Sequence, residues 1–258
     1  MADDVLYERE GHLATITYNR PESLNAINGS LRQDLNAAWE RFRDDENAWV
    51  AIVTGAGRAF CAGADLKDGA GSVGTWPGTF WEIPTINSYE SGLELWKPTI
   101  AAVNGYCLGY GLTAVSRCDF VIAADDAEFG FPEVRLGVPT IVGALRLPDR
   151  VGWSNAMELL LTGDRIDAAR AHEIGLVWKV VPRADLMDEA RRLADRLLQA
   201  APLAARATKE MAARGRSLPW TEAVRFGETM RRVAGRTEDA AEGSRAAAEG
   251  REPRWQGR

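Results

Sequence analysis

The sequence is poor in the residues from which metal centres and disulfide frameworks are built. Its 258 residues include three cysteines and two histidines. Cys61, Cys107 and Cys118 are odd in number and show no CxxC spacing, which favours a reduced cytoplasmic protein over a secreted disulfide scaffold. With only His12 and His172 available, we expect no metal site.

Long hydrophobic runs and an excess of positive charge are also missing. No run approaches the ~18 apolar residues of a membrane span. The acidic N-terminus, MADDVLYERE, has no apolar stretch of the kind found in a signal peptide. The formal net charge of -6 argues against a nucleic-acid-binding protein. We therefore expect a cytoplasmic protein that binds neither membranes nor nucleic acid.

The chain does contain enough apolar residues for a large core, since 46% of its residues are hydrophobic and 26% are charged. Its first part alternates a helix from Ser30 to about Asp44 with apolar strands at 12–18, 50–55, 99–105 and 120–125. Near-continuous apolar strands separated by helices indicate a sheet covered on both faces, and hence an α/β fold. From about Trp153 the apolar residues recur at helical spacing, apart from a short strand at 177–182.

Two glycine-rich loops follow apolar strands, GAGRAFCAGADL (55–66) and NGYCLGYG (104–111). Neither has the spacing of a dinucleotide-binding or P-loop motif, and no G-x-S-x-G elbow is present. Each runs from a strand through small residues to a helix start, where backbone N–H groups are free. Two such loops together suit the binding of one developing oxyanion, although ordinary glycine turns would show the same pattern.

A carboxylate follows the strand at 120–125, in the segment FGFPEVRLG. Glu133 comes directly after Pro132, in apolar surroundings. A carboxylate in an apolar turn can have its pKa tuned for acid–base chemistry. Most glutamates are simply solvated, so this signal gains its weight from the two glycine loops.

These segments together resemble the enoyl-CoA hydratase/isomerase, or crotonase, family. The matching stretches are ITYNRPESLNAIN (16–28), VTGAGRAFCAGADLK (53–67), KPTIAAVNGYCLGYG (97–111), CDFVIAADDAEFGFPEVRLG (118–137) and MELLLTGDRIDAARAHEIGLVWKVVP (157–182). The resemblance implies a spiral core of ββα units, over residues 1–195, and a helical C-terminal region, 196–258, that forms homotrimers or hexamers. It also implies an acyl-CoA thioester substrate and no cofactor beyond the coenzyme A that the substrate carries.

The resemblance also implies roles for particular residues. The backbone N–H groups of Ala64 and Tyr110 would form the oxyanion hole, and Glu133 would be the catalytic acid/base. Tyr110 stands where members of the family usually carry glycine. The residues expected to contact the coenzyme A portion of the substrate are Ala62, Asp65, Leu66 and Lys67.

The sequence departs from the family's hydratases at Thr113, where those enzymes carry a second glutamate. A threonine hydroxyl can hold a water molecule but cannot accept its proton near neutral pH. A single glutamate suits isomerisation, in which Glu133 would move a proton from the α-carbon to the γ-carbon of a 3-enoyl thioester. Hydration by Glu133 alone and a non-catalytic acyl-CoA-binding protein are the alternatives.

A segment rich in tryptophan, residues 76–96, separates the two glycine loops. Glycine-rich stretches with crowded aromatics are typical of pocket walls, and also of aromatics that pack a surface loop. Our hypothesis is that Trp81 and Trp96 line the pocket for the acyl group.

Overall fold

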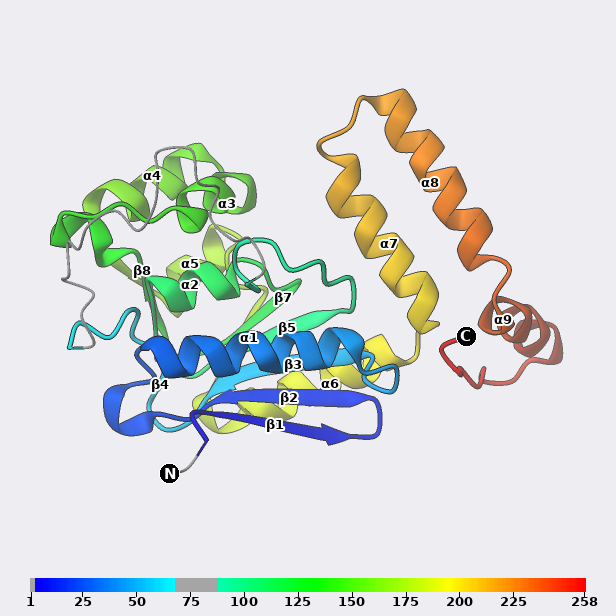
Figure 1. The fold of residues 1–258 in the computed structure, drawn as a ribbon, viewed down its shortest axis with the longest axis horizontal. Coiled ribbons are helices and arrows are strands. Elements are labelled where there is room, and N and C mark those ends of the chain that lie inside the picture. The colour runs from blue at the N-terminus through cyan, green and yellow to red at the C-terminus, as the bar shows by residue number, and fades with distance from the viewer. Residues whose placement is uncertain (1–2, 68–87) are drawn as a thin grey trace.

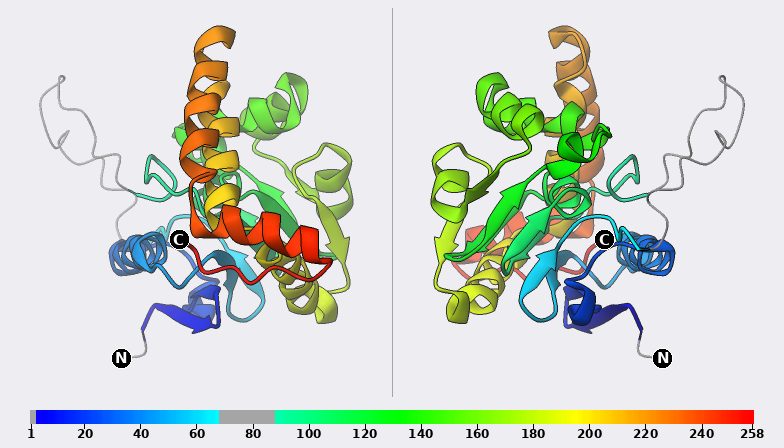
Figure 2. Two further views of the ribbon diagram at one scale, coloured as in Figure 1. Left: turned by 90° about the vertical axis from the view of Figure 1, so that its right-hand side faces the viewer. Right: turned by 90° about the vertical axis from the view of Figure 1, so that its left-hand side faces the viewer.

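The computed structural model describes residues 3–67 and 88–258 (Figures 1 and 2). Its larger sheet has six strands in the order β1-β2-β3-β5-β7-β10. Their bounds are β1 (Val5–Glu10), β2 (Leu13–Tyr18), β3 (Val50–Gly55), β5 (Thr99–Val103), β7 (Phe120–Ala124) and β10 (Lys179–Val181). β1 runs antiparallel to β2, and the other neighbours are parallel. The strands predicted from apolar runs are confirmed, whereas β1, largely exposed and rich in charge, was not predicted.

A smaller sheet has the order β4-β6-β8-β9. Its strands have three residues each and are β4 (Ala59–Cys61), β6 (Tyr106–Leu108), β8 (Glu128–Gly130) and β9 (Arg165–Asp167). β4, β6 and β8 each follow a strand of the larger sheet after a short connection. The chain therefore winds as a spiral in which each turn adds one strand to each sheet, as expected for the crotonase fold.

The pairing of the short strands brings their ends together. β4 pairs in parallel with β6 through Cys61 and Cys107, and β6 pairs in parallel with β8 through Leu108 and Gly130. The carboxyl ends of parallel strands meet at one edge of a sheet, where ligands of α/β proteins commonly bind. The segments that follow Cys61, Leu108 and Gly130 consequently begin side by side.

The centre of the larger sheet is buried on both faces. Along β3, the side chains of Ala51 and Val53 belong to the main core beneath α1 (Gly29–Asp44), and those of Val50 and Ile52 belong to a second core. α6 (Leu186–Leu198) contributes Leu186, Ala190, Leu193 and Ala194 to that second core. This two-sided burial explains why the strand sequence is continuously apolar instead of alternating.

Helix α1 begins one residue earlier than predicted and ends at the predicted residue. The side chain of Asn28 accepts a hydrogen bond from the backbone N–H of Leu31 at 2.8 Å, which caps its first turn. Its buried face carries Leu31, Leu35, Ala38, Trp39 and Phe42. The other helices of the body are α2 (Tyr110–Val115), α3 (Val142–Val151), α4 (Trp153–Thr162) and α5 (Ala168–Glu173).

The C-terminal helices leave the body of the molecule. α7 (Pro202–Gly215) and α8 (Trp220–Ala234) form an arm that projects away from the sheets, and α9 (Glu238–Glu249) follows at its base (Figure 1). The last residues return toward the body, where the indole N–H of Trp255 donates to the carbonyl of Gln199 at 2.8 Å. The expected division of the chain at residue 195 falls within α6 and stays a prediction.

None of the helices in the described part of the chain combines the length and apolarity of a membrane span. The described residues also contain no group of three or more His, Cys, Asp or Glu side chains placed to hold a metal ion. Cys61, Cys107 and Cys118 are buried free thiols.

Candidate active site

The first glycine loop leaves the backbone N–H group of Ala64 without a partner among the described residues. The N–H of Ala62 donates to Leu24 at 3.0 Å, and that of Asp65 donates to Ile27 at 2.9 Å. Ala64, between them, pairs with Ile27 in an isolated β-bridge. The two hydrogen bonds of this bridge join Ile27 to the carbonyl of Gly63 and to the N–H of Asp65. The N–H of Ala64 therefore makes no hydrogen bond within the described residues. Ala64 is solvent-exposed, so this donor is available to a ligand.

The second glycine loop presents a comparable donor at the start of α2. Gly109, with φ 53° and ψ -115°, turns the chain from β6 into the helix, and its carbonyl accepts from the N–H of Thr113 at 2.9 Å. Tyr110 is the first residue of α2, where backbone N–H groups have no partner inside the helix. Its N–H makes no hydrogen bond within the part of the chain that the structure describes.

The two loops are packed against each other. A β-carbon placed on Gly63 would lie 3.4 Å from the carbonyl oxygen of Leu108, and one placed on Gly111 would lie 2.7 Å from the β-carbon of Cys61. A side chain at Gly111 would force the loops apart, whereas one at Gly63 would only reach van der Waals contact with Leu108. The absence of side chains thus brings the backbones of the Ala64 and Tyr110 loops into contact.

Glu133 completes the arrangement from the short helix η2 (Pro132–Leu136), which follows β8. Its Oε1 lies 2.8 Å from the position that a β-carbon on Gly109 would occupy. Its Oε2 is buried and has no hydrogen-bond partner among the described residues. Burial raises the pKa of this carboxyl above its ordinary value, offset in part by a hydrogen bond from its own backbone N–H. A carboxyl with a raised pKa therefore lies beside the loop that carries Tyr110.

Thr113 is buried one helical turn after Tyr110. Its carbonyl accepts from the hydroxyl of Ser116 at 2.6 Å, while its own hydroxyl makes no hydrogen bond within the described residues. No carboxylate occupies this position, and the carboxylate that the structure places against the turn before Tyr110 is that of Glu133.

The residues expected to contact coenzyme A line the outer part of the first loop. Asp65 is paired with Arg20 at 3.2 Å, and its Oδ1 accepts from the backbone N–H of Lys67 at 3.1 Å. Leu66 and Lys67 are exposed, Leu66 to 65%. The role of Ala62, Asp65, Leu66 and Lys67 in binding stays a prediction.

Sequence reasoning missed the side chains that hold these loops in place. Arg20 donates to the carbonyl of Ala26 at 2.6 Å as well as pairing with Asp65. Asn25, buried and with φ 55°, donates through its amide to the carbonyl of Ala59 at 2.8 Å. Both lie in the NRPESLNAIN segment, whose Asn and Pro residues were the available signal for an ordered turn.

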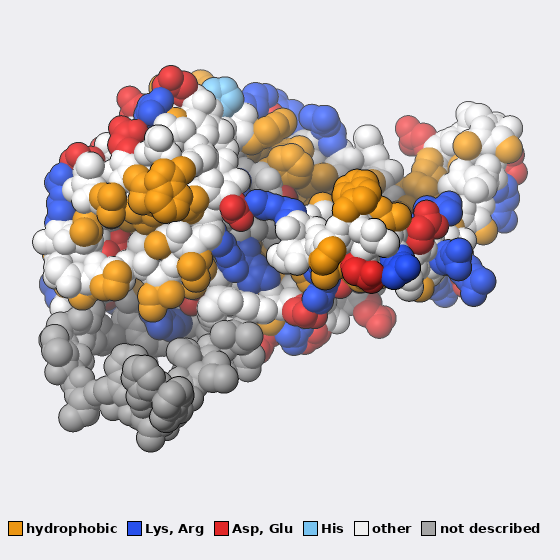
Figure 3. Space-filling view, turned by 90° about the horizontal axis from the view of Figure 1, so that it is seen from above, with side chains coloured by type: hydrophobic (Ala, Val, Ile, Leu, Met, Phe, Trp, Pro, Cys, Tyr) orange, Lys and Arg blue, Asp and Glu red, His pale blue; other side chains and the backbone are white. Residues whose placement is uncertain are grey.

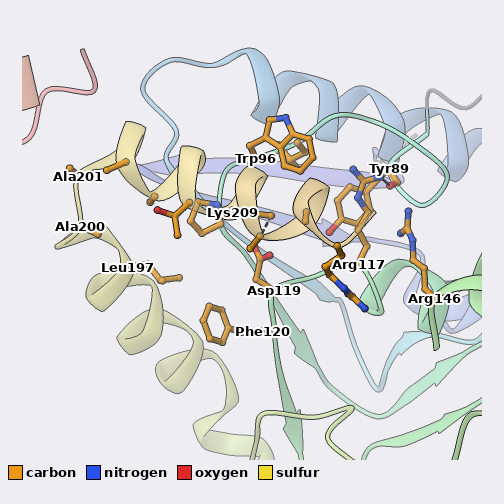
Figure 4. Close-up of a pocket in the computed structure, with 18 residues that line it drawn as sticks. Tyr89, Trp96, Arg117, Asp119, Phe120, Arg146, Leu197, Ala200, Ala201 and Lys209 are labelled. Carbon is orange, nitrogen blue, oxygen red and sulfur yellow. Dashed lines mark hydrogen bonds and ion pairs between the residues drawn. The ribbon is translucent and has the colours of Figure 1, made fainter. Parts of the chain in front are cut away.

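The tryptophan-rich segment is only partly described. Trp81 lies outside the described residues, whereas Trp96 lines a cavity of about 900 Å³ between α7 and the body (Figure 4). The guanidinium of Arg214 lies 5.0 Å from the centre of the Trp96 ring. Of the residues predicted for the catalytic site and for coenzyme A binding, none lines this cavity. It is therefore distinct from the place where Ala64, Tyr110 and Glu133 meet.

Comparison with known proteins agrees with the fold. The profile of the enoyl-CoA hydratase/isomerase family matches residues 8–258. A probable enoyl-CoA hydratase of Mycobacterium bovis is 39% identical over 257 residues, which cover 98% of both chains. Carnitinyl-CoA dehydratase of Escherichia coli is 39% identical over 264 residues, with both chains fully covered. The crystal structure of an enoyl-CoA hydratase from Mycobacterium tuberculosis superposes with a TM-score of 0.90, at 37% identity, covering 99% of this chain and 100% of that one.

The fold and the paired glycine loops define an α/β enzyme of the crotonase type. The chain belongs to the enoyl-CoA hydratase/isomerase family and acts on coenzyme A thioesters. The resemblance noted from the sequence is confirmed.

Proposed function

We propose that Glu133 is the single acid/base of this enzyme and that the N–H groups of Ala64 and Tyr110 bind the thioester oxygen. One observation carries the proposal: Glu133 lies against Gly109, the residue before one of the two free N–H groups. The carboxylate and the donor can then act on adjacent atoms of one substrate, the α-carbon and the carbonyl oxygen.

The reaction that this arrangement supports is proton transfer through an enolate. Removal of the α-proton by Glu133 puts negative charge on the thioester oxygen, between the two backbone donors. Each such donor is typically worth roughly 3 kcal/mol of transition-state stabilisation. In a 3-enoyl thioester the charge spreads to the γ-carbon, where Glu133 would return the proton and give the 2-enoyl isomer. This step needs no group beyond the coenzyme A of the substrate.

Hydration of a 2-enoyl thioester is the second candidate, because the relatives are named as a hydratase and a dehydratase. In that reaction Glu133 would activate the water and protonate the α-carbon in turn, with Thr113 holding the water. Because Thr113 supplies no second carboxylate, we expect isomerisation to be faster than hydration.

Turnover of matched 2-enoyl-CoA and 3-enoyl-CoA substrates tests the assignment. Glu133→Gln keeps the size of the side chain and removes its base, so we expect loss of turnover on both substrates. Glu128→Gln is a matched control, since Glu128 is half-exposed and pairs with Arg165 at 3.3 Å. Full activity of Glu133→Gln would remove Glu133 from the catalytic role.

We also propose that the chain assembles as a homotrimer or hexamer. The arm exposes Trp220 (82%) and Val233 (65%), and the body exposes Ile141 (73%) and Leu145 (74%). Figure 3, which looks down on this face, shows hydrophobic side chains at the surface of both the body and the arm. Two different apolar faces on one chain suit a head-to-tail contact that closes into a ring. Light scattering of the chain and of Trp220→Glu tests this, with a monomeric variant as the expected result.

A further inference from the structure

The cavity between α7 and the body has mostly apolar walls. Leu95, Trp96 and Pro98 line it from the segment before β5, Phe120 from β7 and Leu197 from the end of α6. The wall on the α7 side consists largely of alanines, whose small side chains leave the space open. A volume of about 900 Å³ is that of a small-molecule site, which typically has roughly 300–1,000 Å³.

Two arginines of the lining have no carboxylate partner. Figure 4 shows Arg117 and Arg146 on the side of the cavity away from Leu197. The guanidinium of Arg117 donates to the backbone carbonyls of Tyr89 and Leu93, which carry no charge. Arg146, on α3, makes no hydrogen bond or ion pair within the described residues, and its Nη1 is buried. Both side chains thus lack a carboxylate at ion-pair distance in the part of the chain that the structure describes.

The other charged groups of the lining are already paired. The ammonium of Lys209 lies 2.7 Å from the carboxylate of Asp119, and the guanidinium of Arg216 lies 3.0 Å from that of Asp149. The excess positive charge of the cavity therefore resides on the two unpaired arginines.

Arg146 is the group that a bound anion would satisfy. It is half-buried, and burial, followed by the positive charge of Arg117, lowers the pKa of its guanidinium. A buried donor without an acceptor costs free energy, and two neighbouring cations repel each other. An anion bound beside them would relieve both costs. A carboxylate suits this place because its two oxygens match the planar fork of a guanidinium.

We propose that this cavity is a second small-molecule site, which binds a monocarboxylic acid with an apolar chain. The carboxylate binds Arg146 beside Arg117, and the chain lies between the alanines of α7 and Leu197. Charge complementarity selects the anionic head, and the apolar walls select the chain. The site does not depend on the proposed function, because its lining contains neither Glu133 nor the two glycine loops.

Calorimetric titration of the full-length protein with dodecanoate tests the proposal. We expect dodecanoate to bind, and Arg146→Met, which keeps the apolar stem and removes the charge, to weaken binding about tenfold or more. Arg192→Met is the matched control, because it removes the same charge from an exposed side chain of α6 that pairs with Glu189 at 2.6 Å, outside the cavity. It should leave the affinity unchanged.

Dodecanol separates the role of the charge from a general loss of structure. It has the same chain without the carboxylate, so it should bind the parent protein and Arg146→Met equally and more weakly than dodecanoate binds the parent. Ala212→Phe fills space in the cavity and keeps both arginines, so it should weaken the binding of both compounds. A titration in the presence of saturating butyryl-CoA should give the same dodecanoate affinity, because the two ligands occupy different places.

Three results would overturn the proposal. The first is no binding of dodecanoate to the parent protein, as when a second copy of the chain covers the cavity in the assembled protein. The second is a dodecanoate affinity of Arg146→Met within twofold of the parent value. The third is displacement of dodecanoate by butyryl-CoA, which would place the acid in the acyl-CoA site instead.

Discussion

The carboxylate of Glu133 occupies the space that a side chain at Gly109 would need. Its Oε1 lies 2.8 Å from the ideal β-carbon position of that glycine, closer than a real contact would allow. A side chain at Gly109 would therefore displace the end of the Glu133 side chain.

Gly109→Ala should therefore disable the enzyme. The new methyl group would push Glu133 away, and φ 53° is itself unfavourable for alanine. A displacement near 1 Å at a reacting group can cost about 10²-fold in rate, and we expect a loss of kcat of that order. Gly250→Ala is the control, because Gly250 has φ 67° with open space around it, and it ends α9. It should cost about 1 kcal/mol of unfolding free energy while kcat stays unchanged.

The pH dependence of turnover should report the raised pKa of Glu133. Because burial raises this pKa, the basic form is lost as pH falls through a value above the ordinary 4.5. The acid limb of kcat/KM should accordingly lie above pH 4.5 and disappear in any residual activity of Glu133→Gln. An acid limb at or below the ordinary glutamate value would contradict this prediction.

The raised pKa of Glu133 also makes the stability of the fold depend on pH, and this dependence has the opposite direction to that of turnover. Between the ordinary value and the raised one, the folded state binds more protons than the unfolded state. The contribution of Glu133 to the free energy of unfolding is therefore fully present below pH 4.5 and is lost as pH rises through the folded-state pKa. Urea titrations of the parent chain and of Glu133→Gln across this range give the free energy of unfolding of each. The value for the parent should fall relative to that for Glu133→Gln as pH rises.

Thr113→Glu should increase hydration of a 2-enoyl-CoA. The substitution supplies a carboxylate one helical turn after Tyr110, at the position where hydratases of the family carry their second glutamate. We expect at least a tenfold gain, within the range of 10²–10⁴ that general acid–base groups provide. Thr113→Gln controls for size and should show no gain. Equal hydration by both variants would mean that the missing base is not the limiting feature.

Lys97→Met should weaken the fold without touching the site. The buried ammonium of Lys97 donates to the carbonyls of Phe42 and Asp45, each at 2.6 Å, at the end of α1. Leaving those carbonyls without the charged donor should cost about 2 kcal/mol of unfolding free energy. Lys67→Met is the control, because Lys67 is exposed, and it should leave the free energy of unfolding unchanged. A Lys97→Met chain as stable as the parent would show that water replaces the ammonium at no cost.

The sequence predicted the larger sheet except β1 and missed the strands of the smaller one. Its central strands β3, β5 and β7 are apolar over most of their five or six residues, because α1 and α6 cover the two faces. A three-residue strand such as β6 contains too few side chains to show a period, and it lies inside a segment whose glycines indicate a loop. Its existence follows from pairing with β4 and β8, which is information that no single segment holds.

The residues of the candidate site were likewise predicted only in part. Ala64, Tyr110 and Glu133 follow strand ends in recognisable segments, so their positions could be read from the chain. The place of Arg32 could not, because its guanidinium comes from α1 and meets the Tyr110 ring of α2 only through tertiary packing. Local patterns give no indication of which side chains from distant segments will meet around one phenol.

The register of the small sheet also limits how this chain can vary. Ala64, Tyr110 and Glu133 stand three, two and three residues past the ends of β4, β6 and β8, at Cys61, Leu108 and Gly130. One residue added between a strand end and its reactive group would displace that group by about 3.3 Å, roughly the length of a hydrogen bond. Insertions before the short strands, such as at 56–58, leave those intervals intact. Insertions and deletions should thus be tolerated before each of these three-residue strands. They should be excluded between the end of the strand and the group that follows it.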